Sequence, residues 1–171
     1  MSPLYKLLEE LRRLLTLLSK AIVNIADEPE EIEPEGPTKA DEVYEAAFAE
    51  IGNDLSKLAP DELGCSEAVS KVLKKVYPSF PILISTIRLH DYMRTSTHFV
   101  SSANPIAGSV AIFPTEGKKI GHVGIWGRRG WVMSNNSGGT DKGKWTANYT
   151  TFGFKEEAAK RGLKIYYFIP Q

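Results

Sequence analysis

Residues 121–135 have the sequence Gly-His-Val-Gly-Ile-Trp-Gly-Arg-Arg-Gly-Trp-Val-Met-Ser-Asn, and this stretch decides the fold class. Its two halves are short runs rich in β-branched and aromatic residues on either side of a Gly-Arg-Arg-Gly turn, a pattern that predicts a β-hairpin. Similar runs at 109–113 and 163–169 predict further strands before and after it. We therefore expect the second half of the chain to form an antiparallel sheet.

The register of this hairpin decides which side chains meet. If the two tryptophans that flank the four-residue turn pair with each other, His122 lies opposite Asn135. Directly opposed residues point to the same side of a sheet, with Cβ atoms about 5 Å apart. Asn135 is then predicted to hold the His122 ring by a hydrogen bond. A shift of one residue would reverse the facing of the second strand and offer Ser134 or Asn136 instead.

The segment before the strands has helical patterning. Apolar residues recur at helical spacing over 38–58, 65–76 and 82–95, with a capping residue at Thr38. Helices first and strands later is typical of an α+β domain. We expect N-terminal helices packed on an antiparallel sheet of about four to six strands.

The composition limits the classes of function. The chain has 171 residues, with 21 Lys+Arg balanced by 21 Asp+Glu. Because the formal net charge is zero, the chain lacks the excess positive charge that attracts nucleic acid, and no nucleic-acid partner is expected. Cys65 is the single cysteine, which excludes an internal disulfide and a multi-cysteine zinc site. The sequence shows no cluster of metal-ligating residues, and we expect neither a metal nor a cofactor.

The N-terminal segment differs from the rest. Leucines recur at helical spacing over residues 1–26, which predicts an amphipathic helix with too many charges to span a membrane. Residues 27–38 carry six acidic residues and three prolines, so we expect an extended linker there. Residues 39–171 would then be the functional domain. The apolar face of the helix has three possible targets: its own domain, a second copy or partner groove, and a membrane surface.

Cys65 follows Gly64 and begins the predicted helix 65–76. Unpaired backbone N–H groups at a helix N-terminus stabilise an anion, so a thiol placed there is expected to be acidified. Gly64 would leave room for a substrate, which makes Gly64 and Ser66 candidate substrate contacts. The alternative is that Cys65 is a small buried hydrophobic residue. A histidine that takes the thiol proton and is itself held by a third polar group would favour the catalytic interpretation.

The quoted hairpin resembles part of a known superfamily, as do Gly-Cys-Ser-Glu-Ala-Val at 64–69 and Asn-Pro-Ile-Ala-Gly-Ser-Val-Ala-Ile-Phe at 104–113. These are the NlpC-type and CHAP cysteine peptidases and amidases. The resemblance covers residues 40–170 and implies a papain-like α+β fold. The catalytic residues that it implies are Cys65 as nucleophile, His122 as general base, and a polar third member at Asn135.

Members of this superfamily mostly cut the peptides of bacterial cell walls. The resemblance thus implies a hydrolase of peptidoglycan amide bonds that acts through a thioester acyl-enzyme, with Trp126 and Trp131 as candidate substrate-binding residues. Gly64 stands where the family often has Asp, which leaves the subfamily open. Two alternatives remain, a cysteine acyltransferase and a non-catalytic structural module of a virion. Since no signal peptide is visible, the expectation is cytoplasmic synthesis with a phage-type release to the wall.

Overall fold

The computed structural model describes residues 36–60, 63–137 and 141–171, together with Leu11 and Leu14. The chain divides into two units, residues 1–36 and 37–171. Leu11 and Leu14 are helical and more than half exposed. The rest of the predicted amphipathic helix 1–26 and most of the linker 27–38 lie outside the described residues, so both stay predictions. In the described part of the chain, no helix is long and apolar enough to cross a membrane.

The described residues of the second unit form four α-helices, α2 (Lys39–Ala49), α3 (Cys65–Val76), α4 (Thr86–Thr95) and α5 (Thr151–Arg161). α2 begins at Thr38, which forms a capping box with Asp41. α5 ends at Gly162, whose left-handed backbone closes the helix.

Two helices are shorter than the sequence predicts. The helix expected over 38–58 ends at Ala49, because the chain turns at Gly52 with a φ of +93°. The helix expected over 82–95 begins only at Thr86. Residues 81–85 have no regular secondary structure, and the backbone N–H of Leu83 donates to the Ser70 hydroxyl, which ties this segment to α3.

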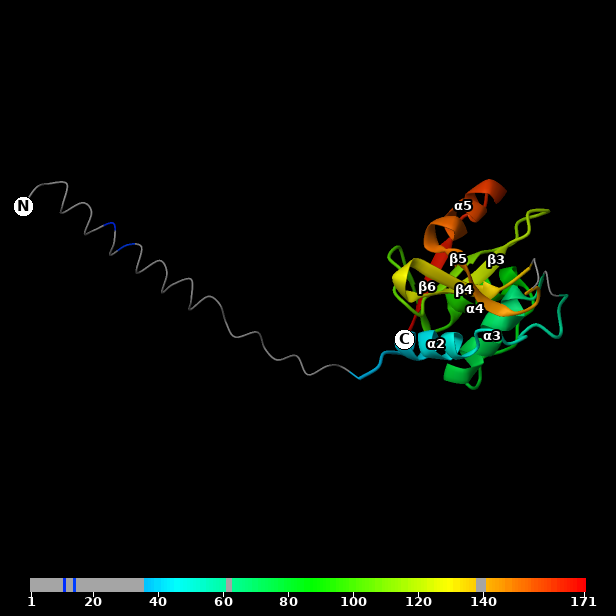
Figure 1. Ribbon diagram of the computed structural model, residues 1–171, viewed down its shortest axis with the longest axis horizontal. Coiled ribbons are helices and arrows are strands. Elements are labelled where there is room, and N and C mark those ends of the chain that lie inside the picture. The colour runs from blue at the N-terminus through cyan, green and yellow to red at the C-terminus, as the bar shows by residue number, and fades with distance from the viewer. Residues whose placement is uncertain (1–10, 12–13, 15–35, 61–62, 138–140) are drawn as a thin grey trace, which may run out of the picture. The chain divides into compact units, whose positions relative to one another are not determined.

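Within the described residues, six strands form one antiparallel sheet in the order β1-β6-β2-β3-β4-β5. The strands are β1 (Phe99–Ser102), β2 (Val110–Phe113), β3 (His122–Trp126), β4 (Trp131–Asn135), β5 (Trp145–Thr150) and β6 (Tyr166–Pro170). Helices α2, α3 and α4 cover one face, and α5 covers the other (Figure 1). The predicted α+β class is confirmed, and the architecture is consistent with a papain-like domain.

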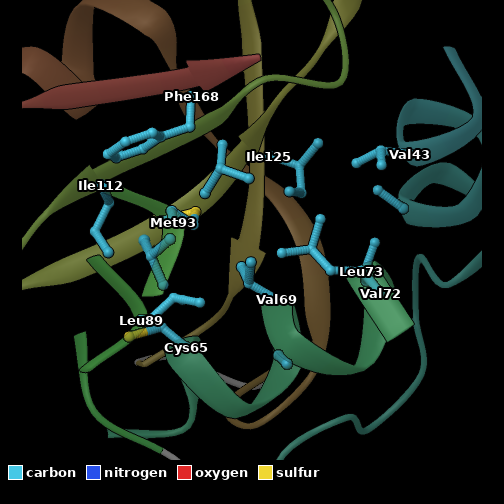
Figure 2. Close-up of a cluster of buried hydrophobic side chains, with 14 of the residues drawn as sticks. Val43, Cys65, Val69, Val72, Leu73, Leu89, Met93, Ile112, Ile125 and Phe168 are labelled. Atoms are coloured by element: carbon cyan, nitrogen blue, oxygen red, sulfur yellow. The ribbon is translucent and has the colours of Figure 1, made fainter. Parts of the chain in front are cut away.

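Alternation along the strands divides the side chains between two cores. Val123 and Ile125 of β3 face the larger core, which they form with α2, α3 and α4 (Figure 2). Phe113 of β2 faces the smaller core on the other side, where it packs against Phe154 of α5. His122 precedes Val123 and therefore belongs to the α5 face.

The hairpin register predicted from the sequence is wrong by one residue. β3 and β4 pair Ile125 with Met133 and Trp126 with Val132, so the two tryptophans do not oppose each other. The shift arises in the turn, where Arg128–Gly130 form a short 3₁₀ helix. Trp131 does not pair with Trp126, and its carbonyl accepts a hydrogen bond from the N–H of Gly127. One residue of shift reverses the facing of β4.

Candidate active site

Cys65 is the first residue of α3, and its side chain is only 5% exposed. It lies at the edge of the larger core, beside the start of the helix (Figure 2). The backbone of Val123 forms a hydrogen bond with the sulfur that favours the thiolate. The thiol therefore lies against the first residues of β3, the strand that His122 begins.

Burial raises the pKa of the Cys65 thiol above its ordinary value. Hydrogen bonds from the backbone of Val123 and from Ser66 act in the opposite direction but are outweighed. The expectation of an acidified thiol is therefore wrong for this structure. A helix N-terminus favours the thiolate, but the loss of hydration at this almost fully buried thiol costs more. The resting thiol is protonated at neutral pH.

His122 is buried on the α5 side of the sheet, 5% exposed. Its ring lies between three aromatic rings, those of Phe113, Tyr149 and Phe154, with centroids 5.5 to 6.0 Å away. Burial, and next the positive charge of Arg161, lower the pKa of His122 to about 4. The imidazole is therefore neutral at pH 7 and able to accept a proton.

The Nε2 atom of His122 lies 3.0 Å from the Ser134 hydroxyl oxygen. Ser134 has one hydroxyl proton and donates it to Oδ1 of Asn148 at 2.7 Å. The Ser134 oxygen must then accept from His122, which places the imidazole proton on Nε2. Nδ1 carries the lone pair and is the basic nitrogen. Ser134, which the sequence offered only under a shifted register, is thus the residue that holds the ring.

Asn148 is a member of this network that sequence reasoning missed. Val132 pairs with Tyr149, but Ser134, two residues further on, pairs with Thr146, so β5 contains an extra residue. Such a β-bulge re-aims side chains, and here it brings Asn148 to Ser134. No pattern in the Gly-, Ser- and Asn-rich stretch before Tyr149 predicts either the strand or its bulge.

Asn135 lies on the opposite face from His122, on the side of Cys65. Its Oδ1 accepts a hydrogen bond of 3.3 Å from the Ser56 hydroxyl. Both side chains fill the space beside Gly64, where an added Cβ would come within 2.1 Å of Ser56 Cβ and 3.0 Å of Asn135 Nδ2. The absence of a side chain at Gly64 therefore admits Ser56 and Asn135, and this close packing fixes the start of α3.

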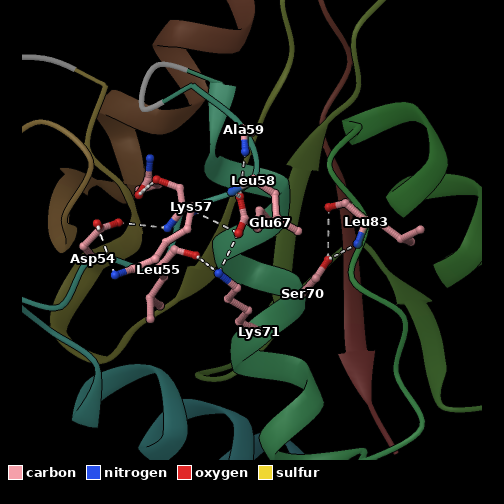
Figure 3. Close-up of polar contacts among 11 residues, drawn as sticks. Asp54, Leu55, Lys57, Leu58, Ala59, Glu67, Ser70, Lys71 and Leu83 are labelled. Carbon is pink, nitrogen blue, oxygen red and sulfur yellow. Dashed lines mark hydrogen bonds and ion pairs between the residues drawn. The ribbon is translucent and has the colours of Figure 1, made fainter.

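Glu67 is a second residue that sequence reasoning missed. It is fully buried in α3, two residues after the thiol, and accepts hydrogen bonds from three consecutive backbone N–H groups, those of residues 57–59 (Figure 3). Burial acts to raise its pKa, but the ion pair with Lys71 and these N–H groups hold the pKa below the usual value. Glu67 thereby fastens the loop that carries Ser56 to the helix that carries Cys65.

Two neighbouring cavities lie at Cys65 and His122. One, of about 510 Å³, is lined by His122, and the other, of about 200 Å³, is lined by Cys65 and Ser66. Leu63, Ile120 and Gly121 border both, so the two cavities adjoin.

The other predicted substrate contacts lie elsewhere. Trp131 is half-exposed and lines a separate cavity with Tyr44 and Phe48 of α2. Trp126 packs edge-on against Tyr167 on the α5 face, with Lys155 over its ring. Neither is among the described residues that line the cavities at Cys65 and His122, so their role in substrate binding stays a prediction without structural support. Among the described residues, no group of three His, Cys, Asp or Glu side chains could hold a metal ion.

Comparisons with known proteins support the fold. No protein-family model and no curated protein matches the sequence. The structure is similar to a chain of the type VI native effector–immunity complex Tae3–Tai3 from Ralstonia pickettii, with a TM-score of 0.51 and 14% identity. The match covers 78% of this chain and 99% of the other. At this identity the likeness shows a shared fold.

Proposed function

We propose that this protein is a cysteine hydrolase that cleaves amide bonds in the peptides of bacterial peptidoglycan. The proposal is supported by the hydrogen bond of Cys65 with the backbone of Val123, the residue after His122, and by Ser134, which holds the His122 proton on Nε2. Cys65 and His122 approach the start of β3 from opposite faces of the sheet, and the proposal requires that they meet around the end of this strand. The proton on Nε2 leaves Nδ1 of His122 as the base for the thiol. In the proposed site Cys65 supplies the thiol, His122 is the base that takes its proton, and Ser134 orients the base.

The acylation step uses the neutral pair directly. Nδ1 of His122 takes the thiol proton as Sγ of Cys65 attacks the amide carbon, and the π electrons of the carbonyl move to its oxygen. We assign the stabilisation of this oxyanion to the backbone N–H of Cys65 at the N-terminus of α3. The tetrahedral intermediate then collapses, the C–N bond breaks, and the amine leaves with the proton that His122 held.

Deacylation repeats the cycle with water. His122 takes a proton from water as the hydroxide attacks the thioester carbon, and collapse of the intermediate breaks the C–S bond. The carboxylic acid leaves and the proton returns to the sulfur. Ser134 and Asn148 hold the imidazole in one tautomer throughout. Asn135 acts, with Ser56, as a positioning group for the start of α3.

The substrate class rests on two supports. The sequence around Cys65 and His122 resembles the wall-cleaving NlpC-type and CHAP enzymes. The fold is also similar to that of a chain from a type VI effector–immunity complex, and this likeness supports the proposal through the fold alone.

The test is digestion of purified peptidoglycan by the full chain, with mass analysis of the released fragments. We expect new fragments that differ from the intact peptides by one water per cut, and a thioester on Cys65 that hydroxylamine releases. Cys65→Ala should abolish both, while Lys74→Ala, a substitution on the exposed side of the same helix, should not. Fragments that persist with Cys65→Ala, or no fragments from the native chain, would overturn the proposal. The second result would favour the non-catalytic module.

A further inference from the structure

The cavity beside His122 has an unusual lining. It lies between the turn that joins β2 to β3 and the end of α5. Among the described residues that line it, three are cationic, Lys118, Lys119 and Arg161, and none carries a carboxylate. Glu116, in the same turn, is not part of the lining. The cavity therefore presents positive charge within reach of the proposed base.

The three cations are not equally neutralised. Arg161 is paired with Glu157 and also donates to the carbonyl of Ile120. Lys119 donates to the carbonyl of Gly162 at 3.1 Å, a neutral acceptor that leaves its charge uncompensated. Lys118 is exposed and has no ion pair or hydrogen bond within the described part of the chain. Two lysine charges are thus available to an anion in the cavity.

The adjoining cavity at Cys65 differs in chemistry. Its described lining is apolar or carries hydroxyl groups, from Ser85, Thr86, Ile87 and Thr115, and includes no charged side chain. The groove is therefore electrostatically asymmetric across the catalytic pair. A substrate lying along it would have its neutral part at Cys65 and its anionic part at His122.

The reaction assigns the two sides of a substrate to the two cavities. After acylation the acyl group is bonded to Sγ of Cys65, so it occupies the cavity at Cys65. The leaving amine receives its proton from His122, so it departs through the cavity at His122. We propose that the cationic cavity binds a carboxylate on the residue that supplies the amine of the scissile amide. This inference rests on the proposed function, because that function defines which side the amine occupies.

Binding to the Cys65→Ala chain tests the subsite without turnover. The probes are a cross-linked peptidoglycan stem-peptide dimer with a free carboxylate on the amine-supplying residue, and the same dimer with a carboxamide there. We expect the carboxylate form to bind about tenfold more tightly at low salt. The substitutions Lys118→Gln and Lys119→Gln together should remove that difference. Lys160→Gln is the matched control, because Lys160 is exposed beside Arg161 but does not line the cavity.

Each outcome decides the proposal. Equal binding of the two dimers, no binding of either, or a preference that survives the double substitution would overturn the carboxylate subsite. Hydrolysis by the native chain is measured separately. If the carboxylate preference is present but no amide is cut, the proposed function fails and the anion site stands. If both dimers are cut with equal kcat/KM and bound equally, the function stands and the subsite fails.

Discussion

The two faces of the sheet protect their reactive groups by different means. On the α3 face the charged side chain of Glu67 is fully buried two residues after Cys65, and Lys71 and three backbone N–H groups stabilise it there. On the α5 face the titratable group itself is uncharged, because His122 is buried among aromatic rings and the positive charge of Arg161 also disfavours its protonation. The α3 face tolerates this buried charge because both carboxylate oxygens of Glu67 accept hydrogen bonds. The α5 face keeps its buried imidazole neutral, so the two faces should respond to different perturbations.

The largest effect is expected from Glu67→Gln. The substitution removes the charge that holds Lys71 and leaves backbone N–H groups of residues 57–59 without a full set of acceptors. Breaking a buried ion pair costs about 3–5 kcal/mol, and urea denaturation should show a loss of that order. Glu42→Gln is the control, because the exposed pair of Glu42 with Lys39 should contribute no more than about 1 kcal/mol. Equal losses in the two variants would contradict the account of the α3 face.

The α5 face should be the acid-sensitive one. The pKa of His122 is about 4 in the folded chain against an ordinary value of 6.5, so between these values the unfolded chain binds more protons. The contribution of the neutral His122 to the free energy of unfolding is fully present above pH 6.5. It is lost as the pH falls towards 4, by about 3 kcal/mol in total. Chemical denaturation across this range should show the loss in the native chain. His122→Gln should flatten this part of the profile, and a native profile already flat would contradict the burial of a neutral imidazole.

The sequence predicts one of these faces better than the other. The helical spacing around Val69 and the position of Cys65 after Gly64 identify α3, because a helix start is a local signal. The partner of His122 was misplaced by one residue, because register depends on the turn at Arg129, whose φ of 57° no propensity indicates. The role of Asn148 could not be predicted for a similar reason, since it reaches Ser134 only through a bulge in the pairing of β4 with β5. Local chemistry could be predicted, whereas contacts between strands required the structure.

Ser134→Ala tests the tautomer on the α5 face. It removes the acceptor of the Nε2 proton and leaves a buried donor unsatisfied, a cost of about 1–3 kcal/mol. We expect kcat for amide hydrolysis to fall by about 10²-fold with KM little changed, because the wrong tautomer would present a proton to the thiol. Thr146→Val is the control on β5, since the buried Thr146 hydroxyl has no hydrogen-bond partner among the described residues. A similar loss of kcat in both variants would mean that the strand, and not the Ser134 hydrogen bond, is responsible.

The smallest effect is expected at Trp131, which lines neither the cavity at Cys65 nor the cavity at His122. Its ring is 47% exposed in the cavity beside α2, so Trp131→Ala should change kcat/KM for peptidoglycan fragments by less than about twofold and stability by about 1 kcal/mol. Ile120→Ala is the contrast, because Ile120 borders both cavities of the groove and is similarly exposed. That truncation should raise KM several-fold through lost apolar contact with the substrate. If Trp131→Ala raised KM more than Ile120→Ala, the substrate would have to extend beyond the groove to α2, and the sequence-based assignment of Trp131 to substrate binding would be right.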